Sequence, residues 1–246
     1  MNNESDKTVD PTKAKKLGPT FTPLEGTSDT TVAAVTGVSS GAGHGVLGTS
    51  KQADGVHGES AAPTFSAVAG IHSAGGHGLY GSSSANAGWF DGNVTINGAL
   101  TVFGDITLPG GADCAERFDT AGDTEIEPGT LVVLDDDGYL KASDTAYDRK
   151  VAGIVAGAKT YRPGIILDGN ETGALRTAVS LIGKAYCKVD AEHGAIAIGD
   201  LLVSSPTPGC AMKAADRDKS LGAVVGKALK PLASGRGMIP VLIALQ

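Results

Sequence analysis

The strongest pattern along the chain is an alternation of apolar and polar positions in residues 93–110. This stretch divides into three six-residue units, each with apolar residues at its second and fourth positions and glycine at its sixth. The apolar positions are Val94, Ile96, Leu100, Val102, Ile106 and Leu108, and the glycines are Gly98, Gly104 and Gly110. A period of two predicts short strands with one apolar face, and glycine permits a sharp bend after each strand.

The apolar face of this hexad segment, residues 93–110, has no partner within the segment itself. Burying the six aliphatic side chains would contribute roughly 9–18 kcal/mol, whereas ordering the backbone costs roughly 1–2 kcal/mol for every residue. One copy alone therefore does not fold, but three copies around one axis shelter each other's apolar faces. We predict an intertwined homotrimeric β-helical shaft over residues 92–111, with these side chains in its core. A hexapeptide β-helix within one chain is the alternative, although it needs more coils than eighteen residues supply.

Residues 35–91 form a glycine-rich region with internal repeats. The stretch 35–50 recurs at 68–83 with eight of sixteen positions identical. A shorter unit, Gly–apolar–x–Gly–x–Ser, begins at Gly45, Gly55 and Gly78. Repeats with glycine at the corners and one apolar residue each predict strands and turns that gain stability only by stacking on others.

Residues 112–246 have an ordinary composition and contain short apolar runs separated by turn residues. The runs are Thr130–Leu134, Val151–Val155, Ile165–Leu167, Ala178–Val189, Leu201–Ser204, Ala223–Leu229 and Met238–Leu245. This half is therefore predicted to be all-β. Three segments also recur at an offset of 70 to 72 residues, beginning at 128, 141 and 151 in the first copy. The recurrence predicts a duplicated domain, folded as a β-barrel or a β-sandwich.

The remaining segment, residues 1–34, is polar, contains prolines and carries a short basic run at Lys13–Lys16. It is predicted to be a flexible attachment arm that orders on a larger assembly. The first residues lack the apolar stretch of a secretory signal, so we expect assembly in the cytoplasm. A formal charge of −7 argues against nucleic acid as a partner. Without a run of eighteen apolar residues, no membrane insertion is expected.

Candidate chemistry is sparse. Four histidines lie in the glycine-rich region, namely His44, His57, His72 and His77. Around a three-fold axis any of them could meet its mates and hold a metal ion, but no ligand spacing supports this, and turn or surface roles are predicted. The acidic run 135–138 resembles a calcium loop only superficially, because its flanks are strands, and a hairpin turn is predicted there.

Nucleophilic chemistry is also weakly supported. The three cysteines, Cys114, Cys187 and Cys210, are widely spaced and form no metal or redox motif. Self-cleavage would need a strained peptide bond beside a nucleophile such as Ser204, Ser205 or Cys210. The segment 204–209 is interpreted first as a rigid turn between strands. We therefore predict a non-enzymatic protein without a cofactor.

The hexads from Gly92 to Gly110, the Gly–apolar–x–Gly–x–Ser repeats and a compact terminal domain resemble trimeric bacteriophage tail-fibre, tailspike and neck-appendage proteins. The fibres of phage-derived contractile injection systems are similar. The resemblance implies an amino-terminal arm that docks on a particle, a slender β shaft, and a terminal domain that sets the register or contacts a surface. Presentation in three copies would strengthen weak contacts, such as those to cell-surface glycans.

Two other functions stay open at this point. In some such families the terminal domain is a self-cleaving intramolecular chaperone, although this chain lacks an obvious cleavage motif. The protein could also cap or decorate a particle, with the β domain making the attachment and the hexad segment serving as a short plug.

Overall fold

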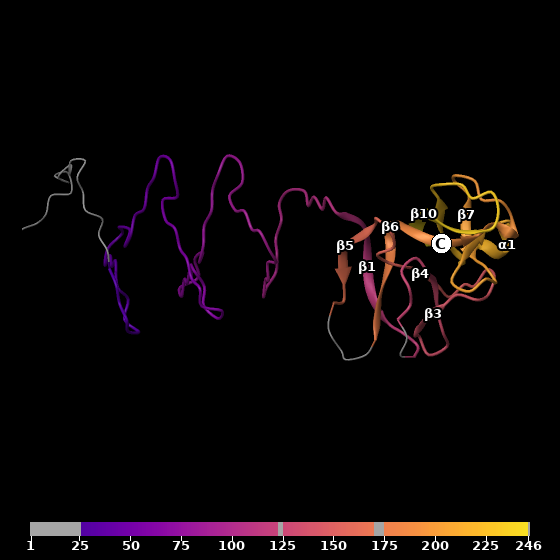
Figure 1. The fold of residues 1–246 in the computed structure, drawn as a ribbon, viewed down its shortest axis with the longest axis horizontal. Coiled ribbons are helices and arrows are strands. Elements are labelled where there is room, and N and C mark those ends of the chain that lie inside the picture. Colours follow the sequence, from indigo (N-terminus) through magenta and orange to yellow (C-terminus); the bar gives the residue numbers. More distant parts are fainter. Residues whose placement is uncertain (1–25, 123–124, 170–174, 246) are drawn as a thin grey trace, which may run out of the picture. The chain divides into compact units, whose positions relative to one another are not determined.

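A computed structural model describes residues 26–122, 125–169 and 175–245. The chain divides into two compact units, Met1–Thr95 and Ile96–Gln246. Within the described residues every strand belongs to the second unit (Figure 1). The strands are β1 (Gly111–Asp119), β2 (Leu131–Leu134), β3 (Leu140–Ala142), β4 (Val151–Val155), β5 (Arg162–Leu167), β6 (Arg176–Asp190), β7 (Leu201–Ser204), β8 (Ala211–Lys213), β9 (Val224–Ala228) and β10 (Arg236–Ala244). Two short helices, η2 (Ala191–His193) and α1 (Arg217–Ser220), complete the described elements.

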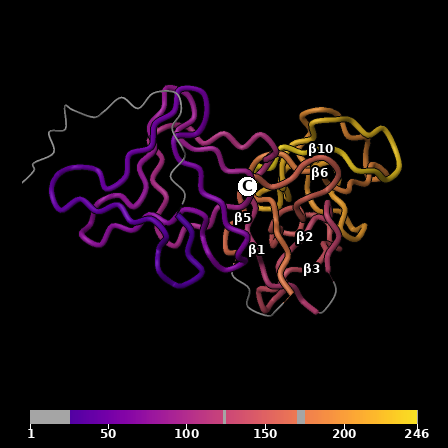
Figure 2. Tube along the Cα trace, turned by 60° about the vertical axis from the view of Figure 1, so that its left-hand side comes forward, coloured from indigo at the N-terminus to yellow at the C-terminus, as the bar shows by residue number. Residues whose placement is uncertain are grey.

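The long strand β6 is shared by two rings of strands. Its first half pairs with β1 and β4, and the ring β1–β6–β4–β2–β3 closes through a bridge between Thr120 and Leu140. Its second half pairs with β10 and β8, and the ring β6–β10–β9–β7–β8 closes where Val189 faces Ala211. We call these rings the first and the second barrel. Figure 2 shows β6 running alongside β10 on one side and β1 on the other.

The two barrels follow the same pairing plan. β2 pairs with β4, and β7 pairs with β9, with a β-bulge at the same step of each ladder. In the first barrel Val132 faces Gly153 and Val133 faces Val151, and in the second Leu202 faces Gly226 and Val203 faces Val224. A bulge bends a strand and increases its twist, so both small rings use this irregularity at the same place.

The turn that enters each of these ladders is also built alike. Gly129 has φ 85° and donates its N–H to the Val155 carbonyl at 2.8 Å. Gly199 has φ 87° and donates to the Ala228 carbonyl, also at 2.8 Å. Because an L side chain at such a φ is strained, glycine is needed at both positions.

Each barrel has an ion pair at matching positions of its antiparallel strand pair. Asp119 faces Arg176 across β1 and β6, with 3.0 Å between the carboxylate and Nε. Asp190 faces Arg236 across β6 and β10, with 3.2 Å between the corresponding atoms. A carboxylate opposite a guanidinium is a favourable cross-strand pair, and it fixes the register where each strand leaves its barrel.

The interiors of the two barrels form a continuous core. The largest buried cluster contains Cys187, Val189, Leu202 and other residues of the second barrel, together with Leu131 and Ile154 of the first. A second buried cluster, of Val132, Leu140, Val155 and Val179, fills the first barrel. Small barrels are filled by side chains rather than by a lumen, so the two rings fold as one body.

The prediction of an all-β carboxy-terminal half is confirmed, and of the two architectures the barrel is the observed one. Each of the seven predicted runs overlaps a strand, whereas β1, β3 and β8 were not predicted. The offset expected for the third recurring segment is wrong. Pairing aligns Val151 with Val224, at a separation of 73 residues, because the β8–β9 connection containing α1 is longer than the β3–β4 connection.

The acidic run at 135–138 forms the predicted hairpin turn between β2 and β3. Asp135 accepts hydrogen bonds through Oδ1 from the N–H groups of Asp137, at 3.0 Å, and Tyr139, at 2.8 Å. Gly138 follows with φ 85°. The Asp135 carboxylate is therefore engaged by its own turn, as is typical of aspartate at such positions.

Gly183 marks the point where β6 passes from one barrel to the other. Its φ is 109°, and a Cβ added there would lie 2.6 Å from the Ala112 carbonyl oxygen and 2.7 Å from the Asp113 Cα. Backbone atoms cannot move aside as a flexible side chain would. The neighbouring strand β1 therefore requires glycine at this position.

We predict that Gly183→Ala destabilises the barrels by about 2–3 kcal/mol, because it adds both backbone strain and a backbone clash. The exposure of Cys187 to a thiol reagent during urea unfolding of the full chain measures this loss. Gly169→Ala is the matched control, since an added Cβ there meets nothing within 4 Å. Equal midpoints for the two variants would contradict the role given to Gly183.

Asp190 is a fully buried carboxylate that four groups stabilise in its ionised form. The Thr207 hydroxyl donates to it at 2.6 Å, the Glu192 N–H at 2.9 Å and Arg236 Nε at 3.2 Å, and His193 lies 3.9 Å away. The hydrogen bond from Thr207 is the main reason that the pKa of Asp190 lies below its ordinary value of 3.8, with burial opposing the shift. A lowered pKa stabilises the fold above the unfolded-state value, and this stability is lost as the pH falls through the folded-state value.

We predict that Asp190→Asn costs about 1.5–3 kcal/mol at pH 7, the usual contribution of hydrogen bonds to a charged group. The difference from the parent protein should shrink as the pH falls below 3.8. Urea unfolding at several pH values checks both statements, with the exposed Asp137→Asn as the control. A constant difference across the pH range would show that ionisation of Asp190 is irrelevant to stability.

Candidate oligomerisation interface

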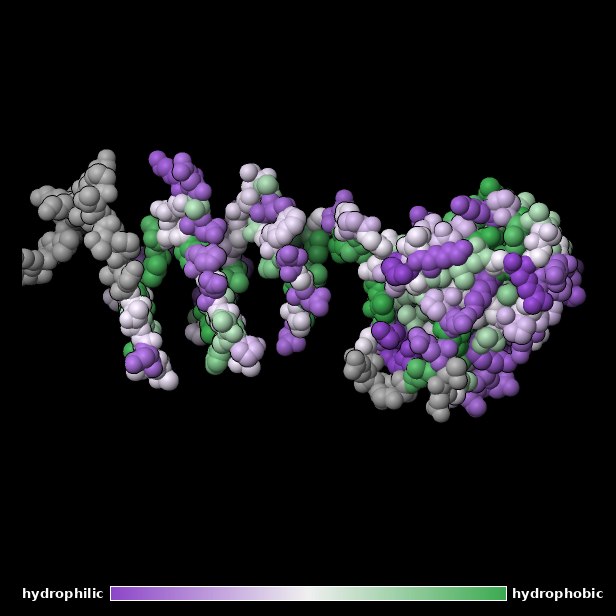
Figure 3. Space-filling view, in the orientation of Figure 1, coloured by the Kyte–Doolittle hydropathy of each residue, from purple (hydrophilic) through white to green (hydrophobic). Residues whose placement is uncertain are grey.

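Residues 26–110 contain no assigned strand or helix, and every one of them is exposed in the single chain. Among these described residues one hydrogen bond joins backbone groups, from Phe65 N–H to the Ala62 carbonyl at 3.5 Å. The strands predicted for the glycine-rich region are therefore absent from the single chain. Figure 3 shows hydrophobic surface recurring along this part of the chain.

The glycine-rich region nevertheless has a regular conformation, in which pairs of glycines bring the chain back against itself. We call each such pair a neck. The necks within the repeats are Gly37 with Gly45, Gly48 with Gly55, and Gly70 with Gly78. A Cβ added at the first glycine of each pair would lie 2.3–2.4 Å from the carbonyl oxygen of the second. Contact this close between two backbone segments is possible only for glycine.

The serine at the sixth position of the repeat turns the chain after each neck. Ser50 Oγ accepts a hydrogen bond from the Ala53 N–H at 3.0 Å, and Ser83 Oγ accepts one from the Ala85 N–H at 3.1 Å. Residues 67–72 form an incomplete repeat that begins with alanine, and His72 occupies its sixth position. The His72 Nδ1 accepts a hydrogen bond from the Gly76 N–H at 3.0 Å. A side chain that bonds the backbone two to four residues ahead stabilises a turn.

The apolar residue of each repeat is exposed to solvent in the single chain. Val46, Val56 and Leu79 occupy the second position of the three complete repeats and are 72 %, 70 % and 76 % exposed. Val35 and Val68 occupy the second position of two incomplete repeats, residues 34–39 and 67–72, in which alanine replaces the first glycine, and they are also exposed. These side chains add an apolar position about every eleven residues, in phase with the necks.

The hexad segment continues this exposed apolar series. The chain bends at 97–98 and at 103–104 and turns at 109–110, so each direction change coincides with a predicted hexad glycine. The six predicted core residues are all exposed, at 59 % for Val94, 51 % for Ile96, 68 % for Leu100, 44 % for Val102, 63 % for Ile106 and 42 % for Leu108. Within one chain these side chains form no core, and their role in a trimer stays a prediction.

The hexad glycines lie at these bends and turns without a left-handed backbone conformation. Gly98, Gly104 and Gly110 do not have positive φ angles, and a Cβ added at any of them meets nothing within 4 Å. The single chain therefore places no demand for glycine at these three positions. Their place in the turns of a shaft stays a prediction.

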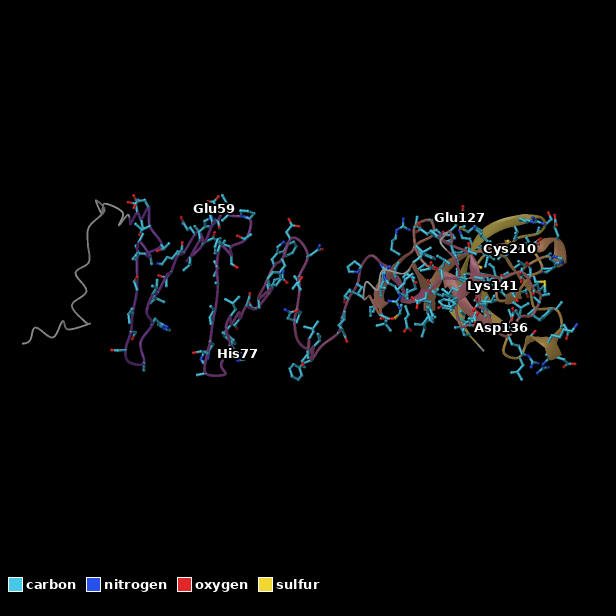
Figure 4. The ribbon with its side chains drawn as sticks, turned by 90° about the horizontal axis from the view of Figure 1, so that it is seen from below. Glu59, His77, Glu127, Asp136, Lys141 and Cys210 are labelled. Carbon is cyan, nitrogen blue, oxygen red and sulfur yellow. The ribbon has the colours of Figure 1, made fainter. Side chains whose placement is uncertain are left out.

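Three of the four histidines of the glycine-rich region contact groups close to them in sequence. His57 Nδ1 is 3.4 Å from Asp54, the His77 ring lies 6.2 Å from the Tyr80 ring, and His72 stabilises its own turn. Figure 4 labels His77 and Glu59 on loops of this region. No group of three or more potential ligands gathers around a metal site in the described part of the chain.

The groups considered for self-cleavage lie in the hairpin turn between β7 and β8. Ser204 Oγ accepts a hydrogen bond from the Asp148 N–H at 2.8 Å, and Ser205 Oγ accepts one from the Thr207 N–H at 3.1 Å. Burial raises the pKa of the Cys210 thiol, with the nearby Asp190 carboxylate adding to the effect. A thiol with a raised pKa is a weak nucleophile at neutral pH. Of the two serines, Ser205 stabilises the turn itself, whereas Ser204 holds the β3–β4 connection.

None of the helices among the described residues is long and apolar enough to cross a membrane.

Comparisons with known proteins assign no family to this chain. No family model matches the sequence, and no curated protein matches it. Among solved structures, the chain is similar to the base formed by the N-terminal part of head fibre gp8.5 of bacteriophage phi29. The TM-score is 0.28 at 13 % identity, over 54 % of this chain and 90 % of that one. A TM-score of this size does not establish a shared fold.

We predict that Gly48→Val disrupts the glycine-rich region, because its Cβ would lie 2.3 Å from the Gly55 carbonyl oxygen and 2.6 Å from Val56 Cγ2. The cost should be about 2 kcal/mol or more per chain. Resistance to proteinase K at rising temperature measures it. Gly41→Val is the matched control, since an added Cβ there meets nothing within 4 Å. Equal resistance of both variants would show that the neck has no structural role.

Proposed function

We propose that the protein is a structural component of a fibre or spike of a phage-like particle, built as a homotrimer. One observation carries the proposal. Residues 26–110 have a regular, repeating conformation but bury none of their side chains and make one backbone–backbone hydrogen bond of their own. A conformation that a single chain does not stabilise needs partners that have the same period.

Energetics favour copies of the same chain as those partners. Ordering the backbone costs roughly 1–2 kcal/mol for each residue. A valine or leucine side chain that stays exposed contributes no burial free energy to offset this cost. Burial of each such side chain contributes about 1.5–3 kcal/mol. In a closed symmetric assembly of identical chains, each repeat would lie against a repeat of another copy, and each hexad against a hexad. Every unit would then bury its apolar side chains against its counterpart.

A trimer also gives the hexad glycines a purpose. In a triple β-helix three chains would wind about one axis, with Val94, Ile96, Leu100, Val102, Ile106 and Leu108 directed inward. The open space around Gly98, Gly104 and Gly110 is where neighbouring chains would come close. A shaft in which each chain is threaded between two others unfolds slowly, because opening one strand requires opening all three.

The other parts of the proposed fibre follow from this arrangement. The arm at 1–34, most of which lies outside the described residues, would attach the fibre to the particle. The barrel domain would trim the register of the three chains or contact a surface, and three copies would strengthen weak binding to ligands such as glycans. We propose cytoplasmic assembly, no enzymatic activity, and neither nucleic acid nor membrane insertion among its interactions.

We predict that the full chain has a native mass of three times 24.6 kDa in solution, with one intact 24.6 kDa species under denaturing conditions. Light scattering and intact mass spectrometry measure the two quantities. A folded single chain at micromolar concentration would overturn the proposal. Two fragments in place of the intact chain would favour self-cleavage instead.

We call the six apolar residues of the hexads, from Val94 to Leu108, the hexad stripe. A pair of substitutions tests whether this stripe is the interface. Val102→Asp should abolish the trimer or strongly lower its melting temperature, because it buries a charge in the proposed core. Phe103→Asp is the matched control, since Phe103 lies next to it, outside the stripe, and is fully exposed. If both variants behave alike, the stripe is not the interface.

A further inference from the structure

The first barrel carries an insertion that the second barrel lacks. In the first barrel the connection from β4 to β6 spans residues 156–175 and includes β5, whereas in the second the connection from β9 to β10 spans only 229–235. Since the second barrel closes with the short connection, β5 is not needed to complete a ring of this kind. Its sequence and position therefore call for another explanation.

The insertion is held firmly against the barrels. The Tyr161 ring packs on the Tyr186 ring at 4.8 Å between centroids, and Lys159 Nζ lies 5.1 Å from the centre of the Tyr186 ring. Arg162 donates from Nη1 to the carbonyl oxygens of Gly157, at 2.6 Å, and Lys159, at 2.7 Å. The contacts with Tyr186 hold the insertion against β6, and the Arg162 hydrogen bonds stabilise the chain just before β5.

β5 is an edge strand with apolar side chains in the open. Among the described strands it pairs with β1 alone, in parallel. Ile165, Ile166 and Leu167 are 45 %, 43 % and 48 % exposed. Pro163 removes a hydrogen-bond donor from this strand, which disfavours pairing with a further strand. Contact through side chains is therefore the mode of binding that this edge favours.

The exposed apolar side chains of β5 join a larger surface. Ile165 faces Cys114 on β1, and Cys114 faces Ile182 on β6, so the three side chains share one face of the sheet. Ile182 is 65 % exposed, and these residues line a hollow of about 270 Å³ together with Leu108. We call Leu108, Cys114, Ile165 and Ile182 the β5 patch. Figure 3 shows hydrophobic surface at the end of the barrel domain that follows the hexad segment.

The β5 patch is continuous with the hexad stripe. Leu108 is the last apolar residue of the stripe, and its Cδ1 lies 3.2 Å from the position of a Cβ added at Gly164, next to Ile165. Asp113 is the one ionisable carboxyl group lining the hollow, and it is buried, with its carboxylate accepting a hydrogen bond from the Ser180 hydroxyl. The surface therefore presents apolar side chains without an exposed charge.

We infer that the β5 patch binds a second copy of this chain and extends the interface of the hexad segment onto the barrel domain. The inference rests on the proposed homotrimer. Continuity with Leu108 identifies the partner, because whatever covers the last hexad also reaches Ile165 and Ile182. In a three-fold assembly each barrel domain would contact the next through this patch, and the insertion would set their spacing.

Cys114 provides a direct probe of this contact in the full-length protein. It is partly exposed in the single chain, whereas Cys187 and Cys210 are buried inside the barrels. We would measure the rate at which a maleimide labels Cys114 in the native protein, together with the native mass. The test variants are Ile182→Asp and the milder Ile182→Ser, and the control is Leu221→Asp, which replaces a 78 % exposed leucine outside the patch.

The expected result is a trimer in all four proteins, with Cys114 labelled about tenfold or more faster in the Ile182 variants than in the parent and the Leu221 variant. Protection of Cys187 confirms that each variant is folded, and Ile182→Ser replaces Ile182→Asp if it is not. A trimeric parent whose Cys114 reacts as fast as in the Ile182 variants overturns the inference and leaves the proposed trimer intact. A parent that is not trimeric overturns both.

Discussion

An extended chain keeps one conformation only when its apolar side chains leave water, and residues 26–110 contain no surface of their own on which to bury them. The necks and the serine turns shape each repeat locally. Neither device covers Val46, Val56 or Leu79, which remain largely exposed. The proposed trimer would supply the missing cover through contacts between chains.

The barrel domain meets the same requirement by a different route. Two five-stranded rings share β6 and one continuous core, so each ring provides part of the surface on which the other is packed. Matching bulges, glycine turns and Asp–Arg pairs fix the register of both rings. The domain buries its core within one chain, and the insertion containing β5 lies outside both rings.

Much of the fold could be predicted from the sequence because its signals are local. Apolar runs such as Val151–Val155 and turn residues such as Gly138 mark strands and hairpins directly. The short strands β3 and β8 were missed, since three residues give no period to detect. The necks and the β5 patch were missed for another reason, because both depend on which distant segments come together. The hexad stripe, by contrast, is visible in the sequence while its partner is not.

Hydrogen exchange of the backbone amides in residues 93–110 of the full-length protein tests most directly whether other copies of the chain stabilise these residues. In the single chain these amides have no backbone partner, so an isolated chain would exchange them at the rate of an unfolded peptide. Pairing between chains predicts slow exchange across all three hexads, lost when the assembly dissociates. Unprotected exchange in the native protein would contradict the central claim that these residues are stabilised by other copies of the chain.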